Sequence, residues 1–247
     1  MNKFGLIVFP LSHSFSKKYF TEKFQELGIS ETNMYELFEL EHIKDLDKIF
    51  KENPNLLGLN VTIPHKVNIL PFLDEIDPDA AEIGAVNVVK IDAKGRKIGY
   101  NSDYFGFKKS LEEFIPEAKN IKALVLGNGG AAKAVTVALK HLQIPFELVS
   151  RRKTEEATIS YFKANNLLNT HKLVINCTPL GTSPVVNECP DLDYEVLSSS
   201  HYFHDLIYNP GETLFMKKAK DAGAHTKNGY DMLVFQAEKS WEIWNKE

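Results

Sequence analysis

A glycine-rich turn in the middle of the chain limits most strongly what this sequence can fold into. The apolar run Ala123–Leu126 leads directly into Gly-Asn-Gly-Gly-Ala-Ala, and small residues predict a helix over 131–142. A buried strand, a glycine turn and a helix in this order are typical of a dinucleotide-binding unit. Gly127 permits the tight turn, and Gly129 lets the backbone approach a pyrophosphate, which the helix N-terminus attracts. An ordinary tight turn between strand and helix is the alternative interpretation.

The end of the next strand, expected over 146–150, indicates which dinucleotide would bind. An acidic residue there would hydrogen-bond the ribose 2′-hydroxyl of NAD, whereas basic residues would accept the 2′-phosphate of NADP. The sequence reads Ser150-Arg151-Arg152-Lys, and guanidinium groups match phosphate geometry. Glu147 falls inside the expected strand, so the pattern favours NADP, with a solvated basic turn as the alternative.

Before this turn, the first hundred residues also alternate between strand and helix patterns. Apolar runs predict strands over 4–9, 34–40 and 57–61, and helical spacing predicts helices over 16–27 and 42–53. Two further apolar runs flank Asp-Ala-Lys-Gly between residues 85 and 100, which predicts a hairpin at the edge of the sheet. This alternation indicates an α/β layer with parallel strands.

The second half of the chain repeats the alternation and ends in a helix. Helices are expected over 104–114, near 155–165 and over 232–244, and a strand over 173–176. We expect two α/β domains, and we expect the last helix to return to the first of them. The predicted boundaries are 1–102 plus 231–247 for one domain and 103–230 for the other.

Composition excludes several classes of function. The 29 basic and 33 acidic residues give a net charge of −4 without long like-charge runs, so neither nucleic acid nor an anionic membrane is an expected partner. The apolar run at 4–11 is too short for a signal peptide or a membrane span. Cys177 and Cys189 form no disulfide framework or metal-ligand spacing, which fits the cytoplasm. His13 and His65 are too dispersed for a metal site and are expected to be polar loop residues, so no metal is predicted.

Two polar segments carry candidate reacting groups. In Asn-Val-Thr62-Ile-Pro64-His-Lys66, a threonine and a lysine follow a short strand, and Pro64 fixes the backbone between them. Both side chains can therefore point into a cleft at the carboxyl end of the strand. The segment Asn-Ser-Asp103 precedes the helix at 104–114, where an N-cap is the alternative role for its polar side chains.

Together with several other motifs, these segments resemble the shikimate dehydrogenase family over nearly the whole chain. The further motifs are Ser12-His-Ser-Phe-Ser16, Gly84-Ala-Val-Asn87, Asn176-Cys-Thr-Pro-Leu-Gly181, Asp205-Leu-Ile-Tyr208 and Asn228 to Gln236. The resemblance implies an N-terminal α/β substrate domain and a C-terminal Rossmann-like NADP domain. It also implies reversible, NADPH-dependent reduction of 3-dehydroshikimate to shikimate in chorismate and aromatic amino-acid biosynthesis, by a monomer or a homodimer.

The resemblance further assigns roles to individual residues. It implies that Lys66 and Asp103 form the catalytic pair, which agrees with the chemistry: hydride transfer to a ketone creates an alkoxide that an ammonium group can stabilise and protonate. Which of the two transfers the proton stays open. The implied substrate-binding residues are Ser14, Ser16, Thr62, Lys66, Asn87, Asp103, Tyr208 and Gln236. The implied cofactor-binding residues are Gly127, Asn128, Gly129, Gly130, Ala131, Ser150, Arg151, Arg152, Thr178, Leu206 and Gly229.

Two other functions are compatible with the same motifs. A relative that acts on quinate is one, although the pair of arginines speaks against an NAD-linked form of it. A metabolite sensor that binds without turnover is the other, although a sensor has no need of both Lys66 and Asp103. Asn128, Lys133 and Arg152 depart from the commonest family pattern, and all three departures concern the geometry of the cofactor site.

Overall fold

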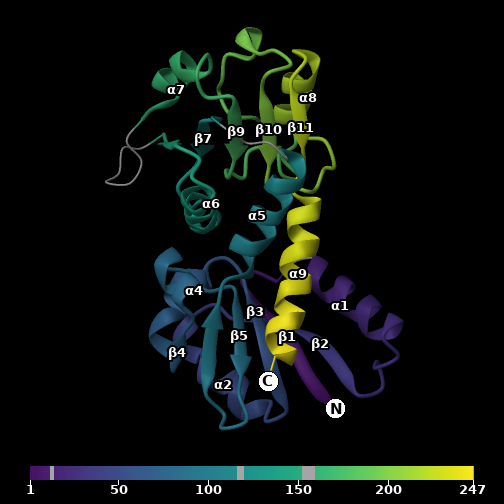
Figure 1. Cartoon of the computed structure of the whole chain (residues 1–247). Coiled ribbons are helices and arrows are strands. Elements are labelled where there is room, and N and C mark those ends of the chain that lie inside the picture. The colour runs from purple at the N-terminus through teal and green to yellow at the C-terminus, as the bar shows by residue number, and fades with distance from the viewer. Residues whose placement is uncertain (12–13, 116–119, 152–158, 247) are drawn as a thin grey trace. The chain divides into compact units, whose positions relative to one another are not determined.

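The computed structural model describes residues 1–11, 14–115, 120–151 and 159–246. The chain divides into two compact units, Met1–Ser102 with Ala237–Glu247 and Asp103–Gln236. Each unit is built on its own sheet, which confirms the expected two-part α/β fold (Figure 1). The sequence predicts the return to the first unit at residue 231, close to the start of the last helix at Tyr230, whereas the first unit resumes further along that helix, at Ala237.

The sheet of the first unit has the strand order β2-β1-β3-β5-β6-β4. Strands β1 and β2 are parallel, as are β1 and β3, whereas β5 and β6 form an antiparallel hairpin. The hairpin is confirmed, but it does not lie at the edge, because β4 pairs with β6 on the outside. The bounds are β1 (Asn2–Val8), β2 (Asn33–Glu39), β3 (Leu56–Val61), β4 (Glu75–Ile76), β5 (Val88–Ile91) and β6 (Lys97–Tyr100).

Helices cover both faces of this sheet. On one face lie α1 (Phe15–Glu26) and the last turns of α9 (Tyr230–Asn245). The helix expected over 42–53 is divided into a 3₁₀ turn, η1, and the shorter α2. The elements of the other face are η1 (Ile43–Asp45), α2 (Leu46–Glu52), α3 (His65–Asn68), η2 (Leu70–Phe72) and α4 (Pro78–Ile83).

Alternation along the strands divides the core of the first unit into two layers. Phe4 points toward α1 and α9, and Ile7 points toward the opposite face. Trp244, near the end of α9, has its ring centre 5.0 Å from that of Phe4 and donates from Nε1 to the Val89 carbonyl at 3.1 Å. A Cβ atom added at Gly58 would overlap the Trp244 ring, so glycine is required there. The predicted return of the last helix to the first unit is therefore confirmed, and Figure 1 shows α9 in yellow lying over β1.

The sheet of the second unit is parallel throughout, in the order β11-β10-β9-β7-β8. Its strands are β7 (Ala123–Leu126), β8 (Phe146–Val149), β9 (Leu173–Asn176), β10 (Tyr202–Asp205) and β11 (His225–Lys227). Because β8 and β9 flank β7 on opposite sides, the strand order reverses at β7. In open α/β sheets, ligands bind beyond the carboxyl ends of the strands at such a reversal.

Two apolar layers cover the two faces of this parallel sheet. Helices α5, α6 and the start of α9 pack against one face, and α7, η3 and α8 pack against the other. The helix expected near 155–165 begins at Tyr161, and residues 152–158 lie outside the described part of the chain. The bounds are α5 (Ser102–Phe114), α6 (Gly130–His141), α7 (Tyr161–Leu167), η3 (Tyr194–Val196) and α8 (Leu214–Asp221).

Candidate active site

The predicted cofactor residues lie where the strands of the parallel sheet end. Because all five strands run in the same direction, the turns that follow them share one edge of the sheet. These residues are Gly127 after β7, Ser150 and Arg151 after β8, Thr178 after β9, Leu206 after β10 and Gly229 after β11. The strand order reverses at β7, so this edge of the sheet contains the position at which ligands bind in open α/β sheets.

The glycine turn opens onto free space in front of α6. Gly127 has φ 99°, which favours glycine, and its N–H donates to the Val149 carbonyl at 2.8 Å. Gly129 is the N-cap of α6, and a Cβ atom built at Gly129 or Gly130 would meet no described atom within 4 Å. The first N–H groups of a helix have no partner within the helix, so this turn fits the pyrophosphate of a dinucleotide. Asn128 is exposed beside it, and Ala131 is partly buried.

A buried polar network supports the turns after β9 and β10. Asn176 donates from Nδ2 to Asp205 Oδ1 at 3.1 Å, and its Oδ1 accepts from the Thr178 hydroxyl at 2.7 Å. Asp205 also accepts from the Ile207 N–H at 3.0 Å and from the Thr213 hydroxyl at 2.6 Å. Burial raises the pKa of Asp205 to about 6, although these hydrogen bonds act in the opposite direction. The network fixes the position of Thr178.

Gly229 allows a close approach between the turns after β10 and β11. Its N–H donates to the Ile207 carbonyl at 3.0 Å, and an added Cβ atom would overlap the Leu206 carbonyl. Only glycine therefore permits this contact. Leu206 is held from the other side, because its N–H donates to the Asn176 carbonyl at 3.1 Å.

The basic turn after β8 is described as far as Arg151. The Ser150 N–H donates to the Ile159 carbonyl at 3.2 Å, and Arg151 is exposed. Arg151 also lines a surface hollow together with Leu180, Tyr194 and Lys218. Arg152, the second predicted phosphate ligand, lies outside the described residues.

In the first unit, the segment after β3 carries two of the predicted substrate residues. The Thr62 N–H donates to the Ile7 carbonyl at 3.1 Å, and the Lys66 carbonyl in α3 accepts from the Val86 N–H at 2.8 Å. These backbone bonds fix both residues beyond the carboxyl ends of β1 and β3. Lys66 is partly buried.

His65 is a buried residue, so its expected role as a polar loop residue is wrong. It is only 2% exposed, and its Nε2 lies 2.5 Å from the Leu40 carbonyl. This contact ties α3 to the end of β2. The error arises because a four-residue helix has no periodicity that would show an inward-facing position. His13 lies outside the described residues.

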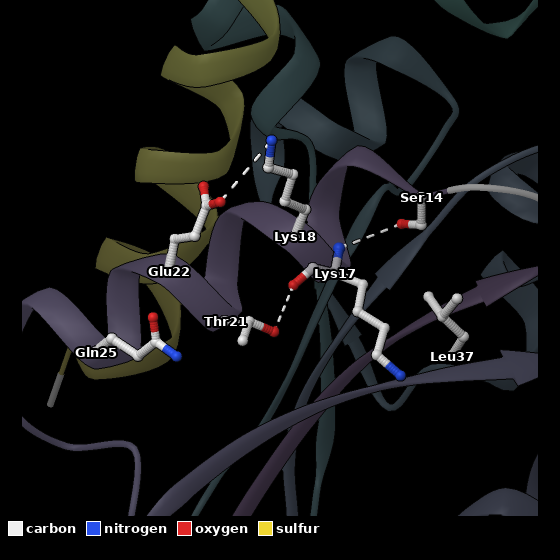
Figure 2. A pocket seen from close by; sticks show the side chains of 7 residues that line it. All are labelled: Ser14, Lys17, Lys18, Thr21, Glu22, Gln25 and Leu37. Carbon is white, nitrogen blue, oxygen red and sulfur yellow. Dashed lines mark hydrogen bonds and ion pairs between the residues drawn. The ribbon is translucent and has the colours of Figure 1, made fainter.

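Ser14 and Ser16 lie at the start of α1. The Ser14 hydroxyl caps the helix by accepting from the Lys17 N–H at 3.3 Å. It also lines a hollow over α1, where Figure 2 shows the Thr21 hydroxyl bonded to the Lys17 carbonyl. Ser16 lies in the first turn of α1 and is partly buried.

Asn87 is fixed by the residue that begins α5. The Ser102 N–H donates to Asn87 Oδ1 at 2.7 Å, and Asn87 Nδ2 donates to the Ser102 hydroxyl at 3.0 Å. A backbone N–H can only donate, so the orientation of the amide is determined. Asn87 is only 3% exposed, and its carbonyl accepts from the Val61 N–H at the end of β3.

The second unit contains the remaining predicted substrate residues. Asp103 lies in the first turn of α5, and Gly106 lies on the same face of that helix three residues later. A Cβ atom at Gly106 would lie 3.0 Å from Gln236 Cβ, so the structure places Gln236 on the face of α5 that carries Asp103. Asp103 and Gln236 are buried, whereas Tyr208 is exposed. The pairing of Asp103 with Lys66 of the first unit stays a prediction.

The structure also shows buried polar residues that received no individual role from the sequence. Asn60, Asn176 and Asp205 lie within the motifs that resemble the family, and this membership is what could have indicated a role for them. The sequence around Tyr35 and Ser240 did not indicate a polar role for either residue. Tyr35 lies in a strand that also contains apolar residues, and Ser240 lies in a helix of mixed polar and apolar residues.

Two further properties concern only the part of the chain that the structure describes. None of its helices has the length and the apolar character that crossing a membrane requires. No cluster of three or more histidine, cysteine, aspartate or glutamate residues could hold a metal ion there.

Comparisons with known proteins agree with the geometry. Residues 6–89 match a family model described as the shikimate dehydrogenase substrate binding domain. The chain is 37% identical to a shikimate dehydrogenase (NADP(+)) of Desulforamulus reducens, over 97% of this chain and 88% of that protein. A solved shikimate dehydrogenase in complex with NADP+ superposes with a TM-score of 0.88 at 34% identity, over 100% of this chain and 90% of that one. The shikimate 5-dehydrogenase of Thermus thermophilus, in complex with NADP(H) and shikimate, has a TM-score of 0.85 at 29% identity, over 100% and 94% of the two chains.

Proposed function

Because the chain belongs to the shikimate dehydrogenase family, we propose that it catalyses the reversible, NADPH-dependent reduction of 3-dehydroshikimate to shikimate. The observation that carries this proposal is the similarity to a shikimate dehydrogenase (NADP(+)) over 97% of the chain. The open N-terminus of α6 supports it, because a dinucleotide needs this space. The matched substrate binding domain supports shikimate as the ligand of the first unit.

We assign the cofactor to the carboxyl edge of the parallel sheet. When bound, NADPH supplies the hydride. Gly127, Gly129 and Gly130 would admit its pyrophosphate, and Asn128 and Ala131 belong to the same turn. Arg151 would bind the 2′-phosphate, and Ser150 and Arg152 are its proposed neighbours. Thr178, Leu206 and Gly229 would contact the nicotinamide half, held by the network around Asp205.

We assign binding and proton transfer to polar side chains of both units. Ser14, Ser16, Thr62, Asn87, Tyr208 and Gln236 would hold the hydroxyl and carboxylate groups of the substrate. As hydride reaches the carbonyl carbon, negative charge develops on its oxygen, which Lys66 and Asp103 acting together would stabilise and protonate. In the oxidative direction the same pair would accept the proton.

The activity itself can be measured by following NADPH absorbance with purified protein. Shikimate and quinate are each supplied with NADP and, in parallel, with NAD. We expect rapid reduction only with shikimate and NADP. Faster turnover with quinate would assign the related activity, and shikimate binding without turnover would indicate the sensor.

The role of Lys66 can be tested by Lys66→Ala. Turnover should fall by about 10²- to 10⁴-fold, the usual contribution of a positioned acid or base, whereas NADP affinity should stay unchanged. Lys94→Ala, which removes an exposed ammonium group from the β5–β6 hairpin, is the matched control. Turnover within a factor of two or so of the control would refute the assignment.

The cofactor preference can be tested by Arg151→Ala. A charge-assisted hydrogen bond contributes about 1.5–3 kcal/mol, so KM for NADP should rise by about 10- to 100-fold. KM for NAD should change little, because NAD lacks the 2′-phosphate. Lys163→Ala, which removes an exposed cation from α7, is the control. Equal increases for both cofactors would show that Arg151 does not bind this phosphate.

A further inference from the structure

A chain of hydrogen bonds between side chains crosses the interior of the first unit. It starts at Tyr35 in β2. The Tyr35 hydroxyl donates to Asn60 Oδ1 in β3 at 2.7 Å. Asn60 Nδ2 then donates to the Ser240 hydroxyl in α9 at 3.0 Å. Three different elements are thus joined by hydrogen bonds between side chains.

The same chain continues to the predicted substrate ligand Asn87. The Ser240 and Ser102 hydroxyl oxygens lie 3.1 Å apart, and Ser102 exchanges hydrogen bonds with the Asn87 amide. Tyr35 and Asn87, the second of which is predicted to bind substrate, are therefore the two ends of one buried network.

Packing does not explain why these groups are polar. Tyr35 is 4% exposed and Ser240 is fully buried, so each hydroxyl has lost its contact with water. The Tyr35 ring stacks on Phe20 with the ring centres 4.8 Å apart, a contact that phenylalanine would keep. Buried polar groups contribute little net stability, but when fully paired they impose one arrangement on the side chains around them.

We propose that Tyr35 and Ser240 are positioning residues, which act through Asn60 and Ser102 to hold Asn87 in the geometry that binds shikimate. This inference rests on the proposed function. Tyr35 would orient the Asn60 amide from β2. Ser240 would orient Ser102, and through it the Asn87 amide, so that part of the substrate site depends on the last helix. Neither residue touches the substrate in this account.

The test compares Tyr35→Phe, Ser240→Ala and the double variant with the wild-type protein. Ser110→Ala is the matched control, because Ser110 is an equally buried helical serine whose hydroxyl bonds to His204 in the second unit. For each protein, KM for shikimate, KM for NADP, kcat and the thermal unfolding temperature are measured. The shift of the unfolding temperature with added shikimate reports binding without turnover.

Each single variant should raise KM for shikimate by about 3- to 10-fold, the range expected for one lost hydrogen bond, and should leave KM for NADP unchanged. The double variant should be less impaired than the product of the two single effects, because either change breaks the same chain. Ser240→Thr, which keeps the hydroxyl, should recover affinity relative to Ser240→Ala. Ser110→Ala should change the thermal unfolding temperature but neither KM value nor kcat.

An active wild-type protein whose Tyr35→Phe and Ser240→Ala variants keep their KM for shikimate would overturn this inference and leave the proposed function intact. Equal increases in KM for both shikimate and NADP would also overturn it, because they would indicate a general structural defect. If the wild-type protein neither oxidised nor bound shikimate, the proposed function would fail, and this inference with it.

Discussion

The buried carboxyl group of Asp205 should make the stability of the second unit depend on pH. It is fully buried, and its pKa is raised from 3.8 to about 6 because burial disfavours the charged form. The folded protein therefore binds a proton more tightly than the unfolded chain does. The resulting stabilisation is complete below about pH 4 and is lost as the pH rises through about 6. A shift of about two units corresponds to about 3 kcal/mol of unfolding free energy.

Asp205→Asn removes the ionisable group and keeps the size of the side chain. The unfolding free energies of wild type and variant are measured by urea denaturation at several values between about pH 4 and pH 7. Other groups titrate in both proteins, so the difference between the two curves isolates Asp205. Relative to the variant, the wild-type protein should lose about 2–3 kcal/mol across this range.

Asp221→Asn, at the exposed C-terminal end of α8, serves as the control and should give a curve parallel to that of the wild type. Parallel curves for Asp205→Asn as well would refute the reasoning, because they would mean that the folded state does not favour the protonated carboxyl.

Two further predictions concern the glycine turn and the packing of the last helix. Gly129→Val should change the unfolding free energy by less than about 1 kcal/mol, because a Cβ atom at this position meets open space. The same variant should raise KM for NADP at least about 10-fold, because the valine side chain fills the approach to α6. An unchanged KM for NADP would place the pyrophosphate elsewhere. Trp244→Ala should lower the unfolding free energy by about 3–5 kcal/mol in urea denaturation, because it removes the ring that packs on Gly58 and Phe4. A loss below about 1 kcal/mol would contradict that packing.

The elements that the sequence predicts well are those whose pattern is complete within a short window. Ala123–Leu126 is an uninterrupted apolar run that stops at a glycine, and the strand has these same bounds. The short elements were not predicted, because β4 has two residues and α3 has four, too few to establish any period. Their conformation depends on pairing with β6 and on the contact of His65 with Leu40.

The candidate site likewise has residues that the sequence predicts and residues that it does not. The glycine turn could be predicted because the strand, the turn and the helix are consecutive, and the substrate residues followed from a family resemblance. The network through Tyr35 and Ser240 could not be predicted, because the two residues come from opposite ends of the chain and only the folded sheet brings both to Asn60. In the sequence, Tyr35 has the pattern of a core aromatic residue.

The first unit is synthesised in two stages, because its residues come from both ends of the chain. Residues 1–102 leave the ribosome early, whereas the segment from Ala237 that covers Phe4, Phe20 and Gly58 is made only after the whole second unit. Until then, the nascent chain exposes an aromatic surface that is suited to chaperone binding or aggregation. A ribosome that stalls before Ala237 would release a chain with a completed parallel sheet and an uncovered N-terminal one. We therefore expect such fragments to be cleared by proteolysis that begins in the first hundred residues.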